Sequence, residues 1–184
     1  MGLEVKLKKI LKLSLSLFLN QVLGAISGFM CVIFVWVLFR DRMASQILFF
    51  AITFSFFYYI EYMAAFKSGF HDEARRNNPS SKSYIVKGAV AGAISAIPAL
   101  LMYIFYLVTS FIGSEGLHQM AVLYYRIFNM YYSWPLGNIF PNHIDMVFIT
   151  SFIPMIIIPM LGYIAGYKNF VFCDLFLKRT KAEK

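Results

Sequence analysis

The stretch LSLSLFLNQVLGAISGFMCVIFVWVLF, residues 13–39, decides the fold class because it contains no charged side chain. It is longer than the about 20 residues with which an α-helix crosses a hydrocarbon layer of about 30 Å. The stretch also lacks the alternation of polar and apolar residues that marks a membrane β-strand. It therefore predicts a transmembrane helix.

Three further segments have the same character, and they cover residues 44–66, 89–112 and 146–167. The whole chain agrees with them, since 60% of its residues are hydrophobic and 14% are charged, against about 25% charged in soluble proteins. Within lipid, backbone polar groups must bond inside their own segment, as they do in a helix. We expect an all-α, polytopic membrane protein whose residues 1–184 form a single transmembrane domain of four transmembrane helices plus interfacial amphipathic helices.

The start of the chain permits a second interpretation, because residues 6–19 resemble the basic and apolar regions of a secretory signal peptide. The apolar run continues well past Ser27, the end of the candidate cleavage site, so the uncut segment spans a bilayer by itself. We therefore expect a retained first helix. Before it, residues 3–12 place an apolar face opposite a basic one, which predicts an interfacial helix on anionic inner-leaflet lipids. The apolar face consists of Leu3, Leu7, Ile10 and Leu11, and the basic face of Lys6, Lys9 and Lys12.

Basic residues orient the predicted helices, because Lys and Arg in short loops stay on the cytoplasmic side. With the N-terminus inside, only Arg40, Arg42 and Arg126 of the 17 basic residues lie outside. We therefore expect both termini in the cytoplasm, in a plasma or inner membrane. The net charge of +8 follows from this topology, and we expect no nucleic-acid partner.

Residues 67–88 form the cytoplasmic loop between the second and third predicted helices. One interpretation is a solvated loop that its basic residues hold in the cytoplasm. In the alternative, Asp72, Glu73, Arg75 and Arg76 continue the second helix by about two turns and form a docking or phosphate-binding surface. Asp72 and Arg76 would then be an i,i+4 ion pair.

Glu61 is the acidic residue inside a predicted span, and ionisable residues within membranes are candidates for function. Asn20 and Gln21 lie at a comparable depth in the first helix. We hypothesise a polar intramembrane pocket that opens to the cytoplasm, in which Glu61 binds a proton or cation and the two amides orient it. Alternatively, Glu61 reaches the membrane interface or pairs with Lys67 or Lys87, while the amides form hydrogen bonds between helices.

Small residues predict where helices approach closely. Each of three predicted helices contains one Gly-x-x-x-Gly pair: Gly24 and Gly28, Gly88 and Gly92, and Gly162 and Gly166. We expect the third and fourth helices to cross at their glycines, or one of these faces to bind another protein. Pro98, Pro154 and Pro159 predict either gentle curvature or a hinge in the same two helices.

The extracytoplasmic segment, residues 113–145, contains apolar and aromatic residues at helical spacing. They predict one amphipathic helix in the outer interface, which anchors the protein or caps a cavity. Its apolar face consists of Met120, Leu123, Tyr124, Ile127, Tyr131 and Trp134.

Recognised catalytic motifs are absent from the sequence, so we expect no catalytic residue, no metal site and no cofactor. We expect an accessory subunit or a small transporter-like protein. Its partners are the lipid bilayer and anionic inner-leaflet lipids, with a homodimer or a larger membrane complex both left open. The alternative is a membrane enzyme that acts on a lipid or lipid-linked substrate at the cytoplasmic interface, through Glu61 or through Asp72 with Arg75 and Arg76.

Overall fold

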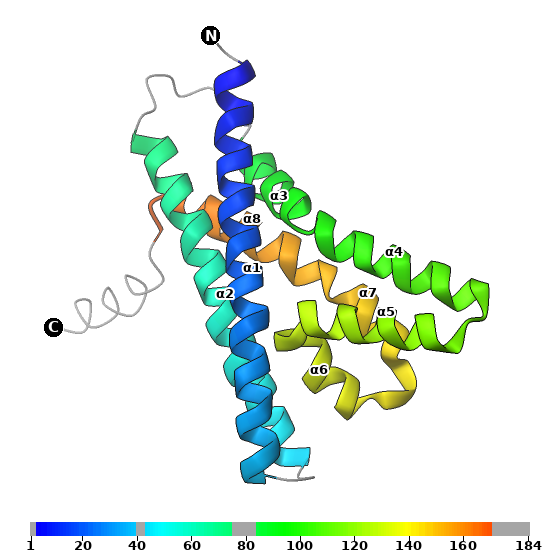
Figure 1. Ribbon diagram of the computed structural model, residues 1–184. Helices are drawn as coiled ribbons and strands as arrows, with labels where there is room; N and C mark the ends of the chain where they lie inside the picture. The colour runs from blue at the N-terminus through cyan, green and yellow to red at the C-terminus, as the bar shows by residue number, and fades with distance from the viewer. Residues whose placement is uncertain (1–2, 40–42, 75–83, 171–184) are drawn as a thin grey trace, which may run out of the picture.

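The computed structural model describes residues 3–39, 43–74 and 84–170; 94% of these residues are helical and none is in a strand. Figure 1 shows two long helices side by side, with the later helices packed across them and extending to one side. The elements are α1 (Leu3–Phe39), α2 (Met43–Ala74), α3 (Tyr84–Ser95), α4 (Ile97–Ile112), α5 (Glu115–Phe128), α6 (Met130–Ile139), η1 (Pro141–His143), α7 (Ile144–Thr150) and α8 (Phe152–Tyr167).

The all-helical prediction is confirmed for the described residues. Three helical stretches are long and apolar enough to cross a membrane: Leu7–Phe34, Ile47–Glu73 and Pro141–Tyr167. A fourth is added if the bent pair Val86–Ser95 and Ile97–Ile112 is counted as one span.

The first two helices are longer than the sequence predicted. α1 runs without a break from Leu3, so the prediction of a separate interfacial helix over residues 3–12 is wrong. α2 continues to Ala74, so the interpretation of residues 67–74 as a solvated loop is also wrong. Both extensions lack proline, the residue that most strongly ends a helix. Arg75 and Arg76 lie outside the described residues.

α8 lies in the middle of the fold, where it packs most extensively against α2 and α3. On the α2 side, a Cβ atom added to Gly162 or Gly166 would collide with the backbone carbonyl groups of Tyr62 and Phe66. Only a residue without a side chain lets the two backbones approach this closely.

The third helix also uses its glycines against α8. A Cβ atom on Gly88 would lie 2.8 Å from the carbonyl oxygen of Pro159, and one on Gly92 would lie 2.6 Å from that of Met155. The predicted crossing of the third and fourth helices therefore occurs at Gly88 and Gly92. The expectation that the glycines of both helices meet there is wrong, because the glycines of α8 face α2 instead. A glycine face can pack against any backbone that comes close, whether or not that backbone has a glycine of its own.

A bend of 47° separates α3 from α4 (Figure 1). Pro98 lies in the first turn of α4, where it has no backbone N–H to donate to the carbonyl group four residues earlier. The bend is sharper than the gentle curvature that was one of the two predictions. It places Ser95, the last residue of α3, at the point where the helix changes direction.

The segment after α4 differs from the single amphipathic helix that the sequence predicted. It forms α5 and α6, which are separated at Asn129, a fully buried residue with φ −104° and ψ 32°. The apolar side chains of Met120 and Leu123 are exposed, whereas Tyr131 is 1% exposed and packs on α1 and α2. The break turns Tyr131 away from the exposed face, into the space beside Gly28.

Candidate functional site

Asp72, near the end of α2, accepts hydrogen bonds from side chains of three other helices. The donors are Lys9 Nζ of α1 at 2.8 Å, Lys87 Nζ of α3, and the Tyr163 hydroxyl of α8 at 2.7 Å. The side chains of Asp72 and Lys87 are 16% and 14% exposed, whereas that of Lys9 is 41% exposed. The Lys87 ammonium also lies 5.3 Å from the centre of the Tyr163 ring. One carboxylate therefore connects α1, α2, α3 and α8.

This arrangement decides between two of the sequence-based alternatives. Lys87 pairs with Asp72, so the interpretation in which Lys87 neutralises Glu61 is wrong. The predicted pairing of Asp72 with Arg76 involves a residue outside the described part of the chain. Glu73, next along α2, is partly exposed and does not join the Asp72 contacts.

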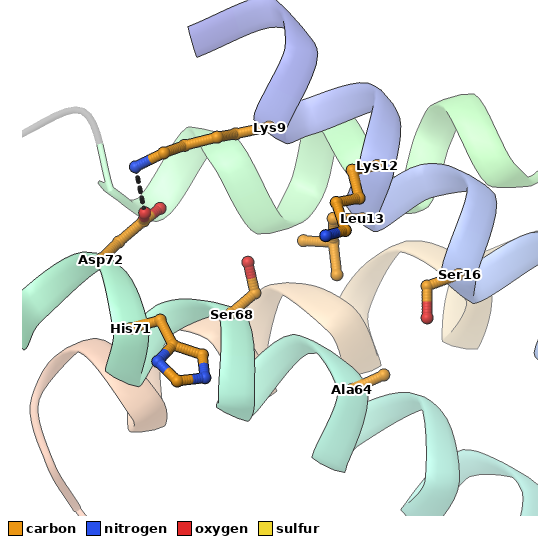
Figure 2. Close-up of a pocket in the computed structure, with 8 residues that line it drawn as sticks. All are labelled: Lys9, Lys12, Leu13, Ser16, Ala64, Ser68, His71 and Asp72. Carbon is orange, nitrogen blue, oxygen red and sulfur yellow. Dashed lines mark hydrogen bonds and ion pairs between the residues drawn. The ribbon is translucent and has the colours of Figure 1, made fainter. Parts of the chain in front are cut away.

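A pocket of about 430 Å³ opens between α1 and α2 beside this carboxylate. Figure 2 shows the Lys9 side chain reaching across one edge to Asp72, with the Ser68 hydroxyl directed into the space between the helices. The polar groups that line the pocket are two ammonium groups, one imidazole, two hydroxyls and one carboxylate. We call it the Lys9–Asp72 pocket; the lining residues are Lys9, Lys12, Leu13, Ser16, Ala64, Ser68, His71 and Asp72.

Glu61 lies deeper, at the centre of a second group of polar residues. Its side chain is 3% exposed, and Gln21 of α1, 1% exposed, lies within hydrogen-bonding reach of the carboxyl. Gln21 Nε2 donates to Ser95 Oγ of α3 at 3.3 Å, and Ser95 Oγ donates to the Gly92 carbonyl at 2.8 Å. Polar contacts thus run from α2 through α1 to the bend of α3.

Two buried tyrosines complete this group, and their hydroxyls are in electrostatic range of the Glu61 carboxyl. The rings of Tyr58 and Tyr131 are 5.7 Å apart, centre to centre. We call Gln21, Tyr58, Glu61, Ser95 and Tyr131 the Glu61 cluster. Among the described residues, two of its buried acceptor atoms have no hydrogen-bond donor: Gln21 Oε1 and Glu61 Oε2. Unpaired buried polar atoms are rare, which marks the cluster as a candidate site.

The structure brings together two of the three residues of the predicted intramembrane pocket. Gln21 meets Glu61, but Asn20 points elsewhere, because consecutive residues of an α-helix are about 100° apart. The cluster is closed to solvent in this conformation, in contrast to the predicted opening toward the cytoplasm. Gly24 and Gly28 of α1 lie close to the cluster, with Tyr131 in contact with both.

Comparison with known proteins gives no relative for this chain. No family model, curated protein or solved structure matches it. The functional conclusion therefore comes from the geometry of these two sites.

Sequence reasoning missed several members of both sites. It passed over Lys9, Lys87 and Tyr163 as partners of Asp72, and the tyrosines and the serine around Glu61. One signal was present, since Glu61 and Asp72 are eleven residues apart and therefore share one face of a helix. That spacing indicates that both acidic side chains point into the bundle, but it does not identify the partners.

Proposed function

We propose that the chain is a multi-pass integral membrane protein with both termini cytoplasmic, in a plasma or inner membrane. Two observations support this proposal: the length of the apolar helices, and the large apolar side chains that these helices leave exposed. Large apolar side chains such as Leu15, Leu23 and Phe56 are 57–59% exposed along the outer faces of α1 and α2. So large an apolar surface is unfavourable in water and matches a hydrocarbon layer.

Within this membrane protein, the Glu61 cluster is the binding site of a small transporter-like protein, and its ligand is a proton or a small cation. The observation that carries the proposal is the pair of buried acceptors, Glu61 Oε2 and Gln21 Oε1, which have no donor among the described residues. A carboxyl proton donates to one acceptor, and a cation binds both oxygens. Ionisable groups at this depth mark ion and proton pathways in membrane proteins.

The surrounding helices provide the elements that could open such a site. Ser95 ends α3 at the 47° bend, and Tyr131 lies in the first turn of α6, after the break at Asn129. A change at either break moves one wall of the cluster relative to α1 and α2, which are continuous. Transporters commonly form their binding sites from discontinuous helices of this kind.

The alternative functions have less support from the geometry. The glycine faces that the sequence offered as docking surfaces for an accessory subunit are all buried within the chain itself. The enzyme interpretation relies on Glu61 or on Asp72 with Arg75 and Arg76. The two oxygens of Asp72 already accept bonds from Lys9, Lys87 and Tyr163, and the two arginines lie outside the described residues.

A flux assay tests the proposal. The protein is reconstituted into vesicles, and internal acidification is followed with a pH-sensitive dye after an external acid pulse. Uptake of Na⁺ and of K⁺ down inward gradients is followed in parallel with dyes selective for each ion. We expect flux with the wild-type protein and with Glu73→Gln, a matched change at a partly exposed residue of α2 outside the cluster, and none with Glu61→Gln. Equal flux for Glu61→Gln and wild type, or no flux above protein-free vesicles for any ion, would show that the cluster is not a transport site.

A further inference from the structure

The Lys9–Asp72 pocket is separate from the Glu61 cluster and has different chemistry. It lies between the first turns of α1 and the last turns of α2, and the two sites share no residue. Its volume of about 430 Å³ falls within the about 300–1,000 Å³ of typical ligand pockets. This volume is several times what a single inorganic ion requires, so its natural occupant is a larger polar group.

The charges around the pocket leave it positive. Asp72 provides one negative charge, and Lys9 and Lys87 both pair with it. Lys12 has no carboxylate within ion-pair distance among the described residues, so its ammonium group is available to a ligand. The hydroxyls of Ser16 and Ser68 provide further donors on the two walls. A compact cation beside hydroxyl donors is a favourable environment for a phosphate group.

The surface next to the pocket indicates where that phosphate comes from. Leu15, Leu19 and Leu23 follow Lys12 at intervals of three, seven and eleven residues, so they lie on the same side of α1. All three side chains are more than half exposed. A phosphate held at Lys12 would therefore lie next to a continuous row of exposed leucine side chains. An acyl chain can pack against this row, whereas a soluble phosphate compound has no apolar part that would contact it.

The geometry points to a binding site in the Lys9–Asp72 pocket for the phosphate-bearing headgroup of an anionic phospholipid. Lys12, Ser16 and Ser68 bind the phosphate, and the leucines of α1 contact the acyl chain. Lys9 stays bound to Asp72 and forms the edge of the pocket. This inference rests on the proposed membrane location but is independent of transport at Glu61.

Native mass spectrometry of the full chain in detergent provides the test. The protein is titrated with phosphatidylglycerol, with phosphatidylcholine as the zwitterionic control, and the lipid-bound fraction is measured. We expect preferential binding of one phosphatidylglycerol and about a fivefold weaker affinity in Lys12→Gln, from the loss of one solvent-exposed ion pair. Ser68→Ala should weaken binding to a smaller extent. Lys8→Gln removes the same charge from an exposed position of α1 that does not line the pocket, and it should bind as the wild type does.

Three results would overturn the inference. Equal binding of both lipids would exclude selection by headgroup charge. An equal loss in Lys8→Gln and Lys12→Gln would indicate diffuse attraction to a basic surface. Displacement of the lipid by an equimolar concentration of glycerol 3-phosphate would identify a soluble phosphate as the ligand. A thermal-shift measurement on each variant checks that it is folded, and Ser68→Ala provides an independent answer if Lys12→Gln is not.

Discussion

The replacement Asp72→Asn tests whether one carboxylate holds four helices together. The variant keeps the shape of the side chain and removes its charge. The Tyr163 hydroxyl can still donate to the amide oxygen, so that contact changes little. Lys9 is 41% exposed, and its pair contributes about 0–1 kcal/mol to the free energy of unfolding, as solvated ion pairs do. Lys87 is 14% exposed and loses its charged partner, which costs about 1.5–3 kcal/mol.

Asp72→Asn should therefore lower the free energy of unfolding by about 1.5–4 kcal/mol. The measurement is a titration of detergent-solubilised protein with sodium dodecyl sulfate, followed by circular dichroism. Lys9→Gln should cost at most about 1 kcal/mol. The double variant Asp72→Asn with Lys87→Gln should be more stable than Asp72→Asn alone, because it no longer carries an unpaired ammonium. Stability of Asp72→Asn within about 0.5 kcal/mol of wild type, the usual range for surface changes, would refute this reasoning.

Two further predictions concern the backbone. Gly166→Ala places a methyl group against the carbonyl of Phe66 and should lower the free energy of unfolding in the same titration by about 1–3 kcal/mol, as overpacking does. Gly116→Ala is the matched control because the space beside that glycine is open, and it should be neutral or stabilising; an equal loss in both variants would contradict the packing argument. Pro98→Ala restores a helical donor at the 47° bend, and full straightening would lengthen the distance between spin labels at the far ends of α3 and α4 by about 3 Å. An unchanged distance would show that packing, rather than the proline, holds the bend.

The positions of the long helices could be predicted because they depend on local composition. Residues 13–39 are apolar for longer than a bilayer requires, and the structure has one helix there. Helix ends were harder to predict, since α2 passes through Lys67 and Asp72 to Ala74. Charged residues end an apolar segment, but they do not end a helix.

The break between α5 and α6 could not be predicted from periodicity. In a soluble protein the apolar face of a helix points inward, and Asn129 would point to water. In membrane-spanning helices generally, both the lipid-facing side and the interior accept apolar side chains, so an apolar pattern alone does not indicate which face is buried. Here Met120 and Tyr124 are exposed, while Asn129 and Tyr125 are fully buried.

The residues of the two candidate sites could be predicted individually but not as groups. Glu61 is conspicuous as an acid in an apolar helix, and the depth of Gln21 suggested a neighbour. The contacts of Ser95 and Tyr131 depend on the bend of α3 and the break before α6, which are properties of the packed chain. The same holds for Asp72, whose donors are separated from it in sequence by up to 91 residues.

The central place of α8 has a consequence for biosynthesis. α8 is the last helix of the described residues, yet it fills the space against which Gly69 of α2 and Gly88 and Gly92 of α3 pack. When a ribosome has produced α1 to α7, those backbones still lack their partner, and Asp72 lacks its contact with Tyr163. Assembly is therefore completed only when α8 arrives, and a chain that stops before Phe152 leaves these backbone surfaces unpacked and accessible to the proteases that remove incomplete proteins.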